Sequence, residues 1–179
     1  MPPSLTSFLP FLSSRLGLSV TALYERQRLL VRHGMLPQPV GRGRGSGVAA
    51  SPASVAKLLL SVLATDSLSE SADLALELGN ARLGAKARAP FERGDKFGVA
   101  LQAILGRPEV ANRVATVIAN RHVNTALVGL MVGKAPSVEV VYFDFVSDRS
   151  FGDNCGLLVR ASLTTQFLSD VATALEKEA

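Results

Sequence analysis

The spacing of apolar residues changes once along this chain of 179 residues, and that change restricts the possible folds more than any single motif. Up to His122 the apolar residues recur every three or four positions, as they do along one face of an α-helix. Beyond it, segments 125–132 and 138–146 are rich in β-branched and aromatic residues and are joined by a turn that contains Gly and Pro. A third strand is expected over 156–162, and a last helix begins at Thr164. The sequence therefore predicts class α+β, with helices followed by a three-stranded antiparallel meander.

Capping signals divide the helical part of the chain into separate helices. Ser4, and then Ser19 or Thr21, precede apolar stripes at helical spacing, and Gly17 between the stripes suits a left-handed helix end. Farther along, Ser51 followed by Pro is a helix start. The expected helices cover residues 4–16, 20–32, 52–63, 70–83, 95–105 and 108–122, with a linker over 84–93.

Composition excludes several classes of protein. Apolar residues make up 47% of the chain and charged residues 19%, which supports a sizeable core and argues against global disorder. No apolar run approaches the ~20 residues that span a bilayer, so no membrane partner is expected. The single cysteine, Cys155, excludes an internal disulfide and fits a reducing cytoplasm. With only His33 and His122 there is little to build a metal cage, and we expect a cytoplasmic protein without a cofactor.

Positive charge is concentrated in the first third of the chain. Residues 1–60 carry seven basic side chains and one acidic one, Glu25, for a net charge of +6, whereas the whole chain carries +4. The basic residues are Arg15, Arg26, Arg28, Arg32, Arg42, Arg44 and Lys57. A basic module joined to a nearly neutral body favours a polyanionic partner for that module.

The first two expected helices have the pattern of a helix-turn-helix. The pattern consists of Leu12, Ser13, Leu16, Gly17, Leu18 and Leu23. The glycine permits a sharp change of chain direction, the leucines hold the two helices together, and the serine is small enough for the position where the helices cross. This arrangement predicts that the second helix is available to read DNA.

The segment that follows resembles a known family of regulators. Residues 28–37 read Arg-Leu-Leu-Val-Arg-His-Gly-Met-Leu-Pro, which is similar to the Arg-Tyr-Tyr-Glu-Arg-x-Gly-Leu-Leu-x-Pro segment of MerR-type winged-helix regulators. The resemblance covers roughly residues 7–60 and implies a wing at the Gly-Arg-Gly-Arg-Gly of 41–45. On that wing, Arg42 and Arg44 would reach a phosphate or a narrow minor groove.

Under this interpretation the basic and polar side chains divide into two roles. The residues expected to contact base edges or phosphates from the second helix are Thr21, Tyr24, Gln27 and Arg28. The residues expected to hold the phosphate backbone are Arg26, Arg32, Arg42 and Arg44. Glutamine pairs well with adenine and arginine with guanine in the major groove. Partial packing into the core is the alternative for Tyr24, and His33 is expected to interact with the end of its own helix.

Candidate enzyme sites have weaker support. A polar loop near the third strand holds Asp144, Asp148, Arg149, Asp153 and Asn154. Its carboxylates suit a hard cation, but solvated acids on a hairpin loop explain them better. Cys155 has no histidine near it in sequence, so a packing role is favoured over a nucleophilic one. The glycines of 41–47 lack the Gly-Lys-Ser/Thr of a phosphate-binding P-loop. We therefore expect no enzymatic activity.

Together these observations predict a winged helix-turn-helix DNA-binding domain over 1–65 and an α+β dimerisation or partner-binding domain over 66–179. The expected function is that of a sequence-selective transcriptional regulator, which binds double-stranded DNA as a homodimer and through its second domain meets another regulatory protein. Two alternatives stay open. In the first, the chain is a protein-interaction module, such as an antirepressor or assembly adaptor. In the second, it is a small hydrolase that uses the acidic loop.

Overall fold

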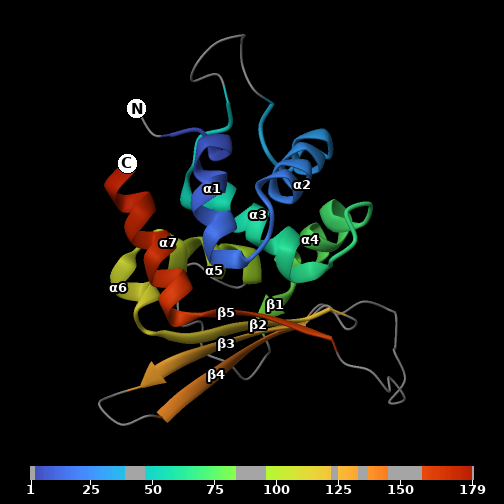
Figure 1. Cartoon of the computed structure of the whole chain (residues 1–179). Helices are drawn as coiled ribbons and strands as arrows, with labels where there is room; N and C mark the ends of the chain where they lie inside the picture. The colour runs from blue at the N-terminus through green and yellow to red at the C-terminus, as the bar shows by residue number, and fades with distance from the viewer. Residues whose placement is uncertain are drawn as a thin grey trace, which may run out of the picture.

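The computed structural model describes residues 3–38, 47–83, 96–121, 125–132, 137–144 and 159–178. The helices in these ranges are α1 (Leu5–Leu16), α2 (Val20–Arg32), α3 (Pro52–Ala64), α4 (Ser71–Asn80), α5 (Phe97–Leu105), α6 (Pro108–Ala111) and α7 (Thr165–Glu178). The strands are β1 (Arg82–Leu83), β2 (Val114–Asn120), β3 (Thr125–Val132), β4 (Ser137–Asp144) and β5 (Arg160–Thr164). The predicted class, α+β, is confirmed (Figure 1).

The starts of the first three helices follow the capping signals of the sequence. Ser4 accepts a hydrogen bond from the Ser7 backbone N–H at 3.1 Å, and Ser19, rather than Thr21, caps α2. At the start of α3 the side chain and backbone of Ser51 and those of Ser54 bond reciprocally, forming a capping box. Between α1 and α2, Gly17 adopts a left-handed conformation with φ of 68° that a side chain would strain.

The prediction of one helix over 108–122 is wrong. Only the short α6 is helical there, and the chain then enters β2 at Val114. The β-branched residues Val114, Thr116, Val117 and Ile118 explain the change, because their side chains fit a pleated sheet better than a helix. The expected linker over 84–93 lies outside the described residues, and α4 ends at Asn80 instead of continuing to 83.

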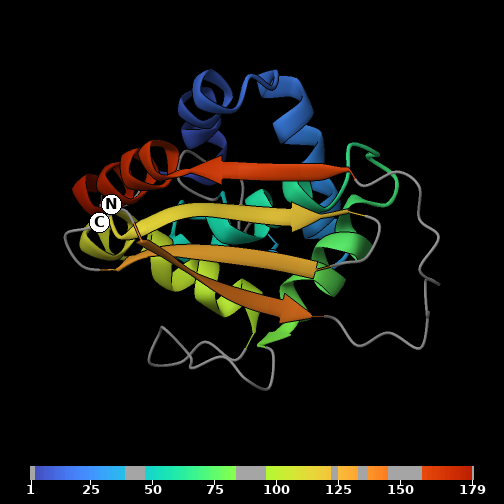
Figure 2. The same cartoon turned by 90° about the horizontal axis from the view of Figure 1, so that it is seen from below.

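The sheet is antiparallel and has five strands in the order β1-β4-β3-β2-β5. The predicted hairpin of 125–132 and 138–146 is present as β3 and β4, but the three-stranded meander is β2-β3-β4. The last strand, β5, crosses over to pair with β2, with Ile118 opposite Ser162. The helices lie on one face of the sheet, and in the view from below the sheet stands in front of them (Figures 1 and 2).

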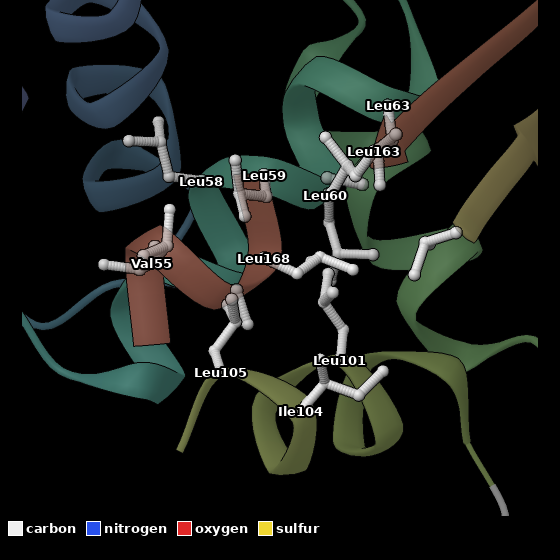
Figure 3. Close-up of a cluster of buried hydrophobic side chains, with 14 of the residues drawn as sticks. Val55, Leu58, Leu59, Leu60, Leu63, Leu101, Ile104, Leu105, Leu163 and Leu168 are labelled. Atoms are coloured by element: carbon white, nitrogen blue, oxygen red, sulfur yellow. The ribbon is translucent and has the colours of Figure 1, made fainter. Parts of the chain in front are cut away.

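The core is centred on α3, which is buried along nearly its whole length. Leucines of α3 meet leucine and isoleucine side chains of α5 and single leucines from β5 and α7 (Figure 3). α3 also contacts α2, α4 and β2, so one continuous hydrophobic cluster runs from α1 to α7. The boundary expected at residue 65 stays a prediction. α3 ends there, and it packs against elements on both sides of that position.

Candidate nucleic-acid interface

One side of α2 is open to solvent and carries four of the eight residues predicted to touch DNA. Thr21, Tyr24, Arg28 and Arg32 are all exposed, while Leu23 and Leu30 on the opposite side are fully buried. The exposed residues are spaced by three or four positions, which places them in one row along the helix. Tyr24 is 42% exposed, which leaves the alternative of partial packing into the core open.

This row borders a groove of about 360 Å³ between α2, the start of α1 and the segment that precedes α3. The groove is lined by Thr6, Tyr24, Gln27, Arg28, Val31, Arg32, Gln38, Gly47 and Val48. Four of the predicted site residues therefore meet at a single hollow. Sequence reasoning missed the contributions of Thr6, Gln38 and Val48, because nothing local to those positions indicates that they face α2.

Main-chain hydrogen bonds fix the far side of the groove. The Leu5 N–H donates to the Val48 carbonyl at 2.6 Å, and the Ala50 N–H donates to the Pro3 carbonyl at 2.8 Å. Ser4 and Ala49 form an antiparallel bridge between these two bonds. The chain before α3 is thus held against the start of α1, and the groove has a fixed backbone wall.

The predicted wing arginines, Arg42 and Arg44, lie outside the described residues. Gln38 and Gly47, which stand on either side of that segment in the sequence, both line the groove.

Gln27 also lines the groove but is only 7% exposed. Its Nε2 donates a hydrogen bond to the Thr6 hydroxyl oxygen at 3.0 Å, which ties α2 to α1. The opposite polarity, from the Thr6 hydroxyl to Gln27 Oε1, has a longer separation of 3.5 Å. The amide is therefore held in place from one side and recessed below the exposed row.

Arg26 faces the interior and is 5% exposed. Its guanidinium donates to the carbonyl oxygens of Ser61, Thr65 and Asp66 at 2.5, 2.9 and 3.1 Å, at the C-terminal end of α3. Burial lowers the pKa of Arg26 from its usual value; Asp66 opposes this shift and Arg121 adds to it. All of these bonds serve the core, so we do not retain Arg26 among the phosphate contacts.

A second arginine binds the same end of α3. Arg121, which follows β2, donates from Nε to the Leu63 carbonyl and from Nη2 to the Val62 carbonyl, each at 3.1 Å. Its Nη1 contacts the Asp66 carboxylate. These carbonyls have no partner within the helix, and positive charge at a helix C-terminus interacts favourably with the helix dipole.

The remaining basic side chains of the first third are divided between the groove and the body. Arg15 pairs with Asp170 of α7 at 2.7 Å, and the Lys57 ammonium donates to the Met35 carbonyl at 2.6 Å. Arg28 pairs with Glu25 on the exposed side of its own helix, at 3.1 Å. The expectation that all the cations converge on one surface is therefore met only by Arg28 and Arg32 among the described residues.

His33 stands at the C-terminal cap of α2, as the sequence predicted. Its Nδ1 also lies 3.6 Å from the Asp73 carboxylate of α4.

Most of the residues of the candidate acidic site are not among those that the structure describes. Asp148, Arg149, Asp153, Asn154 and Cys155 lie outside the described residues, and Asp144 ends β4 opposite Arg82 of β1. Within the described ranges no cluster of His, Cys, Asp or Glu is suited to hold a metal ion. No helix among those residues is long and apolar enough to cross a membrane.

Comparison of the chain with protein-family models, with curated proteins and with solved structures found no match. The resemblance to MerR-type regulators therefore rests on residues 28–37 and on the glycine-arginine segment after them.

Proposed function

We propose that this chain is a DNA-binding regulator that presents the exposed row of α2 to the major groove of a duplex. The observation that carries the proposal is the meeting of Tyr24, Arg28 and Arg32 on one side of α2, beside a groove whose far wall is fixed backbone. The major groove of B-DNA is wide enough to admit an α-helix. In this arrangement Thr21, near the start of α2, is placed at the end of the helix that meets base edges first.

The charges on the row suit phosphate contacts. Arg32 has no ion-pair partner among the described residues, and Arg28 is paired only with the exposed Glu25. Exposed ion pairs are weak, with interaction energies of about 0–1 kcal/mol, so a phosphate can replace the carboxylate at little cost. Under this proposal Arg42 and Arg44, for which the sequence predicts phosphate or minor-groove contacts, add two such contacts.

The rest of the proposed function concerns assembly. A two-fold homodimer would present two α2 helices to successive major grooves, and β5, an outer strand of the sheet, offers an edge for a partner strand.

The test is the salt dependence of duplex binding. Fluorescence anisotropy of a labelled duplex measures the affinity at several KCl concentrations from about 50 to 200 mM. We expect the logarithm of affinity to fall linearly with the logarithm of salt concentration, with a slope set by about 4–6 phosphate contacts. The double variant Arg28→Ala and Arg32→Ala should weaken binding and reduce that slope by about 2.

The matched control removes two exposed arginines elsewhere. Arg107 and Arg113 lie between α5 and β2 and are exposed. Their double replacement by alanine changes net charge equally and should leave the slope nearly unchanged. An equal loss from both double variants would show that only net charge matters. If duplex DNA fails to bind even at the lowest salt concentration, about 50 mM, a protein-interaction module becomes the better hypothesis.

A further inference from the structure

The recessed position of Gln27 sets it apart from the rest of the DNA-reading row. Tyr24, Arg28 and Arg32 are exposed, but Gln27, which also lines the groove, has only 7% of its surface accessible. The edge of a paired base lies inside the duplex groove, flanked by phosphates. A paired base therefore cannot descend into a second groove to reach this amide. A base that has left the stack is narrow enough to enter.

We infer that the groove binds one unpaired nucleotide, with its base inserted between Tyr24 and the backbone wall at Val48. This inference rests on the proposed DNA-binding function and specifies the form of nucleic acid that the site prefers. The volume of about 360 Å³ lies at the small end of the ~300–1,000 Å³ typical of small-molecule pockets, which is suitable for a single nucleotide.

The lining supplies each interaction that such a nucleotide needs. Tyr24 offers an exposed aromatic face for stacking, and Val31 and Val48 offer apolar contact. The charged side chains that line the groove, Arg28 and Arg32, are both cationic, so the charge of the groove complements the phosphate of the nucleotide.

The Gln27 amide offers one hydrogen bond to the base. Its Nε2 donates to the Thr6 hydroxyl oxygen at 3.0 Å and its Oε1 lies 3.5 Å from the same oxygen, so the edge with a donor beside an acceptor faces Thr6. The second N–H of the amide is left to donate to a ring nitrogen or carbonyl oxygen of a base. Thr6 is then a positioning residue, because it holds the amide without reaching the base.

The test compares three labelled probes of about 12 nucleotides per strand, roughly one helical turn: a paired duplex, the same duplex with one unpaired adenine at its centre, and a single-stranded oligo(dA). The chain has two tyrosines and no tryptophan, so the variant Tyr142→Phe leaves Tyr24 as its sole strong fluorophore. In that variant we expect tighter binding of the bulged duplex than of the paired one, together with quenching of the Tyr24 fluorescence by the stacked base.

Variants at the groove separate stacking from charge. Replacing Tyr24 with alanine removes one base-stacking contact and should therefore weaken binding of the bulged duplex by about 5- to 150-fold. Tyr24→Phe keeps the aromatic face and should bind nearly as well as the parent. Gln27→Met, of similar volume, removes one hydrogen bond and should weaken binding of the bulged duplex by about 2- to 12-fold while keeping the salt dependence.

Three results would overturn the inference. Equal affinity for bulged and paired duplexes, with unchanged Tyr24 fluorescence, removes the unpaired nucleotide and leaves the proposed DNA-binding function standing. Absence of binding to all three probes removes both. Equal losses for Tyr24→Ala and Tyr24→Phe also contradict stacking, and thermal melting of each variant checks that it is folded.

Discussion

Replacing the buried Arg26 with methionine should destabilise the protein strongly, although the residue lies on the helix proposed to read DNA. The change keeps an apolar stem of similar length and removes the guanidinium, which donates three hydrogen bonds to the end of α3. The Ser61 carbonyl is left in a buried environment, while those of Thr65 and Asp66 are partly accessible to water.

The magnitude follows from these three bonds. A buried carbonyl without a partner costs about 1–3 kcal/mol, and hydrogen bonds from a charged donor contribute about 1.5–3 kcal/mol each when fully buried. Because water replaces part of two of the bonds, we expect a total loss of about 3 kcal/mol in the free energy of unfolding.

Urea unfolding followed by far-UV circular dichroism measures this loss, since the chain has no tryptophan. With a slope of about 2 kcal/mol per molar urea, the midpoint should fall by about 1.5 M. Arg28→Met, on the exposed side of the same helix, is the matched control and should change stability by about 0.5 kcal/mol or less. A loss below about 1 kcal/mol for Arg26→Met would refute the assignment of this side chain to the core.

Three further substitutions test separate contacts by thermal or urea unfolding. Gly98→Ala should cost about 1–3 kcal/mol, because its new Cβ would lie 3.0 Å from the Gly79 carbonyl oxygen and push α5 away from α4; a neutral effect would contradict this close approach. Ser51→Ala removes the capping box of α3 and should cost about 1 kcal/mol, with Ser51→Asp restoring most of it. Arg15→Ala breaks the pair with Asp170 and should cost less than about 1 kcal/mol, so a larger loss would show that this pair is more than a surface contact.

Sequence reasoning located the N-terminal helices because their signals are local. A serine that accepts a backbone N–H, or a glycine that adopts positive φ, needs only its immediate neighbours. These signals predicted the starts of α1 and α3 at the correct residues and the end of α1 at Gly17. The start of α7 was equally local, since the Thr164 hydroxyl accepts from the Phe167 N–H at 3.3 Å.

The errors come from information that is not local. Pro108 marks a true helix start, but the distance over which that helix continues depends on whether the following residues find strand partners. β2 finds two, β3 and β5, and that pairing outweighs any helical preference of Val114–Asn120.

The positions of Arg26 and Gln27 had a signal that the charge pattern obscured. They lie three and four residues after Leu23, and Leu30 follows at the next turn, so all four share the buried stripe of α2. Reading arginine as a surface residue by default hid this spacing. The row formed by Tyr24, Arg28 and Arg32 was predictable from the same periodicity, whereas the facing wall at Val48 depends on long-range hydrogen bonds.

The two guanidinium groups at the end of α3 have a consequence for how the protein opens. One comes from α2 and the other from the residue after β2, and they bind different carbonyls at the same helix end, so releasing either α2 or β2 leaves part of that end without partners. Amide hydrogens of α2, of the last turn of α3 and of β2 should then exchange with solvent deuterium as one cooperative unit, with a single free energy of opening. Fraying of the α2 surface would be confined to its ends.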